Sequence, residues 1–271
     1  MSNDQLNAIV SQKIEVSPGL IILRIIPVDW ELPNFKAGQF TVLGLPGTAP
    51  RHEFADPEED LKDPSKLIRR AYSVSSSSVN KEYIEFYITM VASGALTPRI
   101  FNLKTGDKIF LSNKFTGMFT LDMVKPGSNI ILLGTGTGLA PYMSMLRDDL
   151  PCNSSRKYVI VHGARHSWDL GYRSELNTIA NVCRNFTYIP AITRPDSEHI
   201  PWGGESGYIQ ELWIKKIIQE KAGFEPHPDN SHIFLCGNPS MIDTMVETLE
   251  SEGFREHSKK SPGQIHLERY W

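Results

Sequence analysis

The sequence predicts a two-domain protein, with an N-terminal antiparallel β-barrel in residues 1–121 and a C-terminal α/β domain with a parallel sheet in residues 122–271. The length of 271 residues fits about two domains at roughly 150 residues each. The first half reads as short strands separated by turns, which is typical of barrels and sandwiches. In the second half, apolar runs alternate with helical patterns, which indicates βαβ units and a parallel sheet.

The strands predicted in the first half are short β-rich runs bounded by turn residues. They are residues 20–27, 40–45, 71–75, 83–91 and 108–112. In the fourth run, Tyr83, Glu85 and Tyr87 alternate with aliphatic and aromatic neighbours, as expected of an antiparallel strand. One short helix over residues 98–103 interrupts the series.

An acidic, proline-containing segment over residues 52–66 breaks this pattern. Its carboxylates are concentrated in residues 56–63. Charge runs are usually solvated, so we expect a surface loop, with contact to a partner as the alternative. The segment is longer than we expect at this place in a barrel.

The second half predicts five strands and four helices in alternation. The strands are residues 129–133, 157–161, 186–192, 232–235 and 264–267, and the helices are residues 139–150, 174–182, 209–221 and 239–252. Ligands of such sheets bind at the carboxyl ends of the strands, near the point where the strand order reverses. We therefore expect a ligand site at that edge of the sheet.

Composition excludes several classes of protein. A net charge of −3, from 28 basic and 31 acidic residues, gives no basic footprint for nucleic acid. No apolar run approaches the roughly 18 residues of a membrane span, and residues 1–7 lack the features of a secretory signal. We expect a cytoplasmic protein without a membrane span, and a monomer.

Cysteine usage is sparse. Cys152, Cys183 and Cys236 are odd in number and far apart, which predicts neither a disulfide framework nor a zinc or iron–sulfur site. We expect reduced thiols and no metal. Redox chemistry would then require a bound cofactor or a lone thiol.

A glycine-rich turn, Gly134-Thr135-Gly136-Thr137-Gly138, lies between the first strand and first helix of the second half. Glycines let a ligand approach the backbone, and the free amides of a helix start favour anions. The turn lacks the Gly-x-Gly-x-x-Gly pattern, and no acidic residue ends the next strand. A nucleotide site and a tight turn packed under the sheet both remain open.

Two arginines follow the next two strands. Arg165 ends the Val161-His162-Gly163-Ala164-Arg165 segment, and Arg194 ends Ala191-Ile192-Thr193-Arg194. Parallel strands place both guanidinium groups on one edge, where they would bind a phosphate bidentately. A single arginine is usually just solvated, but the pair favours NADP over NAD.

The order of motifs along the chain resembles the ferredoxin–NADP⁺ reductase superfamily. The motifs are Lys36-Ala37-Gly38-Gln39-Phe40, Arg70-Ala71-Tyr72-Ser73, Gly94-Ala95-Leu96-Thr97, the glycine turn, Cys236-Gly237-Asn238-Pro239 and Glu268-Arg269-Tyr270-Trp271. They span nearly the whole chain, and the aromatic end is most similar to that of the bacterial ferredoxin (flavodoxin)–NADP⁺ reductases.

The resemblance implies an FAD-binding barrel. The FAD-binding residues that it implies are Arg70, Ala71, Tyr72, Ser73, Tyr87, Ala95, Leu96, Thr97, Thr137, Tyr270 and Trp271. Arg70 would hold the pyrophosphate with the 95–97 segment, Tyr72 would lie against the isoalloxazine, and Ser73 would approach the flavin N5. Tyr270 would cover the other flavin face and Trp271 the adenine. Tyr87 is nearly as well explained as an ordinary barrel residue.

The resemblance also implies an NADP(H)-binding second domain. The residues concerned are Gly136, Thr137, Gly138, Ala164, Arg165, Thr193, Arg194, Tyr208, Cys236, Gly237, Asn238 and Met241. Cys236 would orient the nicotinamide, and Glu268 would be the carboxylate of the site, so that Ser73, Cys236, Glu268 and Tyr270 are the implied catalytic residues. Tyr208 stands where the bacterial enzymes tend to carry a further arginine, which weakens the expected preference for NADP.

The implied function is FAD-dependent hydride transfer between NADPH and flavin, followed by single-electron transfer to ferredoxin or flavodoxin. Two alternatives remain open within flavoproteins: an NADH-dependent reductase component of an oxygenase, and a flavin electron-transfer subunit of a larger complex. A nucleotide-binding α/β protein without flavin is the third.

Overall fold

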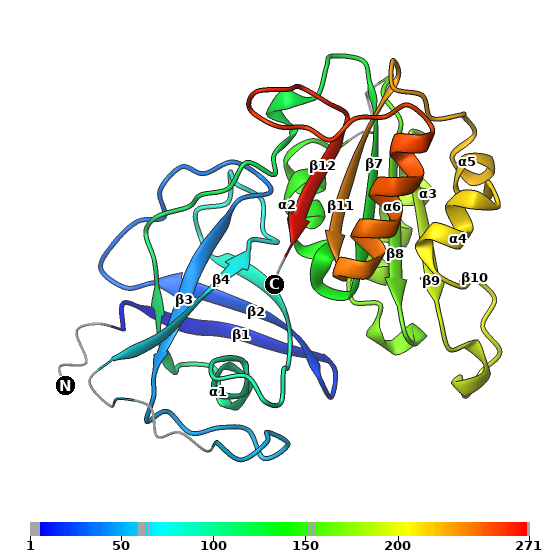
Figure 1. Cartoon of the computed structure of the whole chain (residues 1–271). Coiled ribbons are helices and arrows are strands. Elements are labelled where there is room, and N and C mark those ends of the chain that lie inside the picture. The colour runs from blue at the N-terminus through cyan, green and yellow to red at the C-terminus, as the bar shows by residue number, and fades with distance from the viewer. Residues whose placement is uncertain (1–5, 59–62, 64–65, 151, 153–154, 270–271) are drawn as a thin grey trace. The chain divides into compact units, whose positions relative to one another are not determined.

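A computed structural model describes residues 6–58, 63, 66–150, 152 and 155–269. The chain divides into two compact units, Met1–Thr120 with Met143–Asp148, and Leu121–Tyr142 with Asp149–Trp271 (Figure 1). Helix α2 (Ala140–Asp148) begins in the second unit, and its last residues group with the first.

The first unit is a six-stranded antiparallel sheet in the order β4-β3-β6-β1-β2-β5. Its elements are β1 (Ala8–Ser17), β2 (Leu20–Pro27), β3 (Phe40–Pro46), β4 (Leu67–Ser73), β5 (Ile84–Thr89), α1 (Thr97–Asn102) and β6 (Lys108–Leu111). An antiparallel bridge between Val74 and Phe86 joins the end of β4 to β5 and brings the two edges of the sheet together. The predicted antiparallel barrel is confirmed.

Strand β5 departs from the predicted alternation, because all of Ile84 to Ile88 is buried. Glu85 lies inside the unit, where its carboxylate accepts hydrogen bonds from Arg24 Nε and Arg147 Nη1, each at 2.7 Å. A buried carboxylate requires such charged partners to offset its lost hydration. Arg147 also donates to Ser75 O at 2.8 Å.

The second unit is a six-stranded parallel sheet in the order β10-β9-β8-β7-β11-β12. Its strands are β7 (Asn129–Thr135), β8 (Tyr158–Ala164), β9 (Phe186–Ile192), β10 (Glu205–Ser206), β11 (Ser231–Gly237) and β12 (Ile265–Arg269). Besides α2, its helices are α3 (Arg173–Val182), α4 (Ile209–Ile214), α5 (Ile217–Ala222) and α6 (Pro239–Ser251). The predicted α/β fold is confirmed.

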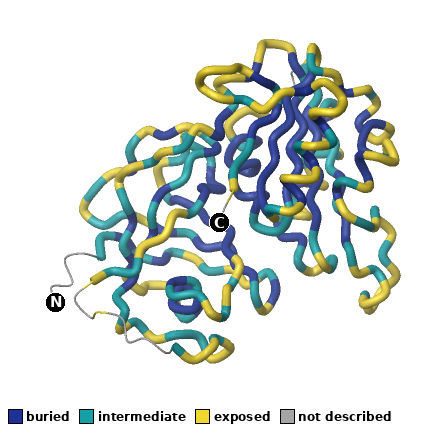
Figure 2. The backbone as a smooth tube through the Cα atoms, viewed as in Figure 1, coloured by how far each residue is buried: buried dark blue, intermediate teal, exposed yellow. Residues whose placement is uncertain are grey.

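The central strands of this sheet are buried along their length (Figure 2). Alternate residues of β7 and β11, such as Ile131, Leu133, Ile233 and Leu235, pack in one apolar cluster with α4, α5 and α6. Helices on a parallel sheet require apolar residues throughout the strands, which explains the continuous apolar runs of the sequence.

Several features differ from the sequence-based expectation, including the short strand β10, which was not predicted. Strand β1 was not predicted, and the helix expected over residues 209–221 is two helices separated at Lys216, whose φ is 60°. Cys152 and Cys183 form a disulfide with their Cα atoms 4.3 Å apart. The expectation that the cysteines are unpaired was therefore wrong for this pair, because folding brings together residues that are 31 positions apart.

The described residues contain neither a membrane-spanning helix nor a cluster of metal-ligating side chains. No helix among them has the length and apolarity required to cross a membrane. Among the same residues, no group of three or more histidine, cysteine, aspartate or glutamate side chains is arranged to hold a metal ion.

Candidate functional site

The strand order of the second unit reverses at β7, because β8 lies on one side of it and β11 on the other. The glycine turn begins in the last residues of β7, and Cys236-Gly237-Asn238 begins in the last residues of β11, so both lie at the carboxyl ends of the strands. They are joined by a hydrogen bond in which Asn238 N donates to Thr135 Oγ1 at 2.8 Å. This is the position at which open α/β sheets bind ligands.

Glycine is required where these two turns meet. A Cβ at Gly138 would lie 2.3 Å from Cys236 O, and one at Gly237, whose φ is +125°, would lie 2.2 Å from Thr135 Oγ1. The interpretation of the glycine turn as tight packing is thus correct at Gly138. The residues Gly136–Leu139 form a short 3-10 helix before α2, in which Gly138 and Leu139 are buried.

His162, on β8, contacts the backbone of the glycine turn. It is fully buried, with Nε2 3.1 Å from Gly136 O and Nδ1 3.5 Å from the Tyr188 hydroxyl. Because a carbonyl oxygen only accepts, Nε2 carries the proton and Nδ1 accepts from the hydroxyl. Burial lowers the pKa of His162 from 6.5 to about 4, so the ring is neutral near pH 7.

Cys236 and Glu268 are directly paired in the register of β11 and β12. The thiol is buried, and its Sγ lies 3.9 Å from Glu268 Oε2. The hydroxyl of the nearby Tyr142 is shared between two backbone carbonyl oxygens, to which it donates: Leu133 O at 3.0 Å and Phe234 O at 2.9 Å. Burial, and then the nearby Cys236 and Glu268, raise the pKa of Tyr142 well above its usual range. The structure therefore brings together a thiol and a carboxylate that the sequence separates by 32 positions.

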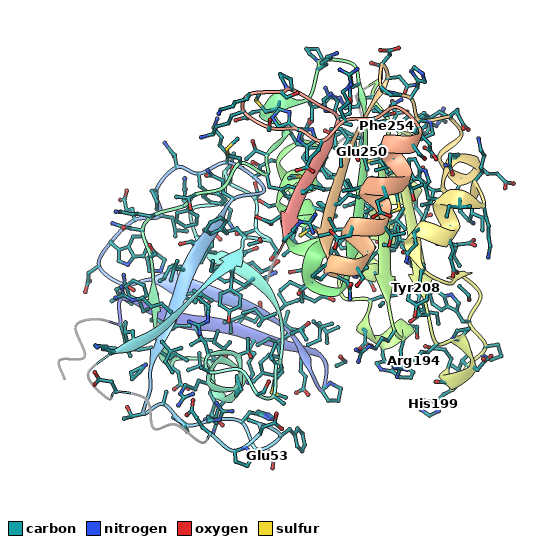
Figure 3. All side chains as sticks on the ribbon, in the orientation of Figure 1. Glu53, Arg194, His199, Tyr208, Glu250 and Phe254 are labelled. Carbon is teal, nitrogen blue, oxygen red and sulfur yellow. A yellow bond between two sulfur atoms is a disulfide. The ribbon has the colours of Figure 1, made fainter. Side chains whose placement is uncertain are left out.

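The two predicted phosphate-binding arginines lie at the carboxyl ends of adjacent strands, β8 and β9. Arg194 N donates to Arg165 O at 3.0 Å, and both residues are exposed. Ser167 N and Oγ donate to the Glu198 carboxylate at 2.8 and 2.5 Å, which ties the two loops together a few residues further on. Figure 3 shows Arg194 at the same end of the unit as Tyr208.

The remaining residues predicted to bind the nucleotide differ in their solvent exposure. Ala164 and Thr193 are half-buried at the strand ends and are joined by a hydrogen bond of 3.0 Å from Thr193 N to Ala164 O. Tyr208 is 58% exposed where α4 begins. Asn238 Oδ1 caps α6 through Ser240 N, and Met241 is buried in the apolar cluster under that helix. The predicted channel roles of Asn238 and Met241 stay predictions.

In the first unit, the predicted flavin-contacting residues lie on β4. Arg70 and Ala71 are exposed, and Arg70 Nη1 donates to Arg69 O at 2.7 Å. Tyr72 is half-buried and packs edge-on to Phe86, with ring centroids 6.4 Å apart, and burial raises its pKa above the usual range. Ser73 is buried. Tyr87, on β5, is 3% exposed, so its predicted cofactor contact stays a prediction.

The predicted pyrophosphate segment lies in a turn of residues 91–97, called here the 91–97 turn. Thr97 Oγ1 accepts from Val91 N at 3.0 Å and donates to Val91 O at 3.2 Å, so its hydroxyl closes the turn. Ala95 is half-buried and Leu96 is buried. Within the part of the chain that the structure describes, the amides of Ala95 and Leu96 donate no hydrogen bond to protein.

Comparisons with known proteins give a consistent result. A flavodoxin/ferredoxin–NADP reductase of Buchnera aphidicola is 31% identical over 245 residues, which cover 90% of this chain and 91% of the relative. The flavodoxin/ferredoxin–NADP reductase of Escherichia coli is 31% identical and covers 88% of each chain. The chain belongs to the flavodoxin/ferredoxin–NADP reductase family. The resemblance drawn from the sequence is confirmed.

Two further comparisons agree with this family. The family model described as the oxidoreductase NAD-binding domain matches residues 132–247. The crystal structure of a ferredoxin NADP⁺ reductase from Neisseria gonorrhoeae, described with bound FAD and NADP, has a TM-score of 0.82 at 24% identity and covers 98% of both chains. The reductase fold therefore extends over both units.

Sequence reasoning missed several residues of these sites. His162 gave no signal beyond standing on an apolar strand. Arg51, Glu58 and Arg99, described below, were missed because the segment around Glu58 reads as a solvated loop. Tyr270 and Trp271, the predicted flavin and adenine contacts at the C-terminus, lie outside the described residues.

Proposed function

We propose that this member of the flavodoxin/ferredoxin–NADP reductase family is an FAD-dependent enzyme that exchanges hydride with NADPH and single electrons with ferredoxin or flavodoxin. The observation that carries the proposal is the pairing of Cys236 with Glu268 beside the glycine turn at the strand-order reversal. An ordinary nucleotide-binding turn has no need of a buried thiol beside a half-buried carboxylate at this point.

The second unit has the groups needed to bind a phosphorylated dinucleotide. Gly136, next to Thr137, would let a phosphate approach the backbone, because a Cβ there would meet no protein atom within 4 Å. Gly138 and Gly237 allow the close contact between the two turns that frame this position. Arg165 and Arg194 would bind the 2′-phosphate of NADPH with charge-assisted hydrogen bonds. Tyr208 is exposed and would stack on the adenine.

Cys236 and Glu268 would hold the nicotinamide end. The buried thiol gives a compact, weakly polar contact, and the carboxylate accepts a hydrogen bond from the carboxamide or adjusts the proton balance. Together they would fix the ring orientation, which lowers the barrier to hydride transfer by restricting geometry rather than by covalent chemistry. Asn238, through its cap on α6, would keep this turn rigid.

The first unit has the groups needed for FAD. Tyr72 offers an aromatic face, Ser73 a hydroxyl and Arg70 an exposed guanidinium on a single strand. The amides of Ala95 and Leu96 supply donors for a pyrophosphate. When bound, FAD supplies the conversion of a two-electron hydride into single electrons. Tyr270 and Trp271 would complete this site, as implied by family resemblance.

The proposed partner is a small acceptor protein, ferredoxin or flavodoxin, and the proposed location is the cytoplasm. The test is the rate of NADPH oxidation by the purified chain with ferricyanide, then with each carrier protein. NADPH-dependent activity with both ferricyanide and a carrier is expected. Activity with NADH only would favour an oxygenase reductase component. A yellow chain without ferricyanide activity would favour a flavin subunit that depends on a larger complex.

A further inference from the structure

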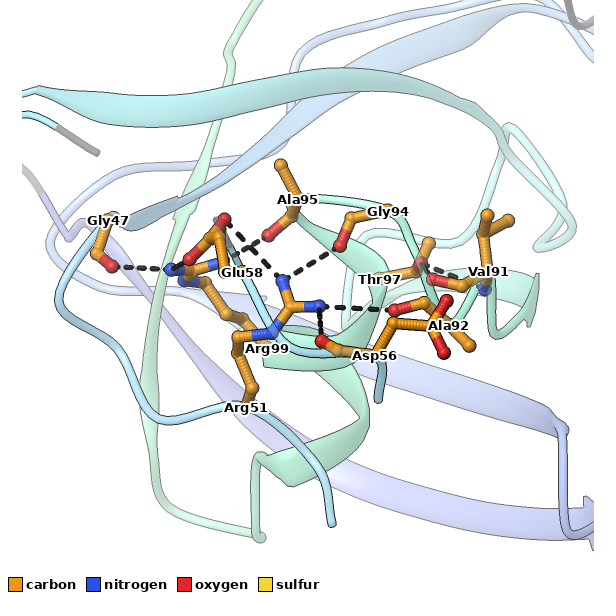
Figure 4. Close-up of polar contacts among 10 residues, drawn as sticks. All are labelled: Gly47, Arg51, Asp56, Glu58, Val91, Ala92, Gly94, Ala95, Thr97 and Arg99. Atoms are coloured by element: carbon orange, nitrogen blue, oxygen red, sulfur yellow. Dashed lines mark hydrogen bonds and ion pairs between the residues drawn. The ribbon is translucent and has the colours of Figure 1, made fainter. Parts of the chain in front are cut away.

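Two arginines hold the carbonyl side of the 91–97 turn (Figure 4). Arg51 Nη1 donates to Gly94 O at 3.0 Å, and its Nη2 donates to Ala92 O at 3.1 Å and Asp56 O at 2.9 Å. Arg99 Nη1 donates to Ala95 O at 2.6 Å, and its Nη2 donates to Gly47 O at 2.5 Å. Consecutive carbonyls of the turn are thus fixed by side chains from two separate parts of the unit.

Glu58 connects the two arginines. Its carboxylate forms an ion pair with Arg99, with Oε2 2.6 Å from Nη2, and lies 3.5 Å from Arg51 Nη1 through Oε1. Arg99 is only 2% exposed, so its guanidinium requires an opposite charge to offset the loss of hydration. Glu58 belongs to the acidic segment that reads as a solvated loop. At Glu58 that expectation was wrong, because the carboxylate is directed into the unit.

The direction of the amides follows from the planarity of the peptide bond. In a trans peptide, the C=O of one residue and the N–H of the next point in opposite directions. The contact of Arg51 with Gly94 O therefore turns Ala95 N–H away from Arg51. In the same way, the contact of Arg99 with Ala95 O turns Leu96 N–H away from Arg99. Among the described residues, neither of these two amides donates a hydrogen bond to protein.

We propose that Glu58 is a positioning residue for the pyrophosphate of FAD, acting through Arg51 and Arg99 on the amides of Ala95 and Leu96. The inference rests on the proposed FAD-binding function of the first unit. It gives the acidic segment a role in cofactor binding, without contact to the cofactor itself. Removing the charge of Glu58 leaves Arg99 buried without its counter-ion, which loosens the turn that it holds.

The test compares Glu58→Gln with the matched control Glu53→Gln, which makes the same chemical change at an exposed position of the same segment. Flavin fluorescence measures the dissociation constants of FAD and riboflavin from the full-length apoprotein. Riboflavin lacks phosphate, so it reports on the flavin-ring site alone. Glu58→Gln is expected to raise the dissociation constant of FAD at least tenfold, with less than a twofold change for riboflavin and no change for Glu53→Gln.

Equal weakening of FAD and riboflavin by Glu58→Gln, or no weakening of either, would overturn the positioning role. If Glu58→Gln does not fold, Arg51→Lys is judged by the same criterion, because it keeps the charge but loses the fork that spans two carbonyls. Amide hydrogen exchange gives a ligand-independent check, in which Glu58→Gln should accelerate exchange in residues 91–97 and leave Ile84–Thr89 unchanged. Failure of the unaltered apoprotein to bind FAD would instead contradict the proposed function.

Discussion

Cys236 and Glu268 face each other on neighbouring strands of the second unit, with the thiol Sγ 3.9 Å from the carboxylate Oε2. The pair is placed by two features of the sheet. The register of β11 and β12 sets the two residues side by side, and the close approach of Gly138 to Cys236 O fixes the start of the turn. A small change at either residue should therefore alter chemistry more than stability.

Replacing Glu268 by glutamine is expected to slow the reduction of the bound flavin by NADPH about tenfold or more, because the carboxylate orients the nicotinamide and balances charge. Stopped-flow absorbance of the flavin measures the rate. Glu250→Gln, an exposed change at the opposite end of the same unit (Figure 3), is the control and should leave the rate unchanged. An unaltered rate in Glu268→Gln would remove this residue from the chemistry.

Replacing Arg165 and Arg194 together by alanine is expected to raise the KM for NADPH and leave that for NADH nearly unchanged. Each charge-assisted hydrogen bond to a phosphate contributes about 1.5 to 3 kcal/mol, so a rise of at least tenfold is expected. Steady-state kinetics with both nucleotides measure the effect, and Arg184→Ala, an exposed arginine before β9, is the control. Equal loss with both nucleotides would contradict the phosphate assignment.

Replacing Glu85 by alanine is expected to lower the free energy of unfolding by about 2 to 3 kcal/mol, because Arg24 and Arg147 lose the carboxylate they share. The two arginines retain some exposure, which keeps the loss below that of a fully buried pair. Urea unfolding measures the change, with the exposed Glu82→Gln as reference. A loss no larger than that of the reference would show that this buried charge cluster contributes little.

Acid should destabilise the second unit through His162. Its pKa is lowered to about 4 by burial, below the value of 6.5 in an unfolded chain, so the unfolded state binds the proton more readily. The contribution is fully present above about pH 6.5 and is lost as the pH falls toward 4, by roughly 3 kcal/mol in total. Unfolding by urea at several pH values measures the slope, and His162→Gln should reduce it by up to one proton. An identical slope in the variant would place the acid sensitivity elsewhere.

The elements that could be predicted are those with strong local patterns. Strands β2 and β9 occupy the predicted residues, because each is rich in apolar β-branched and aromatic residues, although Arg24 interrupts β2. Strand β1 was missed because polar residues such as Gln12, Lys13 and Glu15 hide its pattern, although antiparallel pairing with β2 stabilises it. The helix break at Lys216 follows a positive φ that the sequence does not signal at a lysine.

For the candidate sites, the positions of individual residues at the sheet edge were easier to predict than the side chains that they contact. Cys236 and Arg194 follow apolar strands, so their place at the sheet edge follows from the alternation of strands and helices. Glu58 could not be predicted, because its ion-pair partner Arg99 is 41 positions away and charged segments are usually solvated. The Cys152–Cys183 disulfide was missed for the same reason, since it depends on tertiary proximity.

The most direct test of the proposed function is an anaerobic titration of the purified chain, followed by its visible absorption spectrum, first with NADPH and then with NADH. A yellow protein whose flavin band is bleached by about one equivalent of NADPH, and much less readily by NADH, is the predicted result. A colourless protein that cannot be reconstituted with FAD, or a flavin band that NADPH leaves unchanged, would contradict the account.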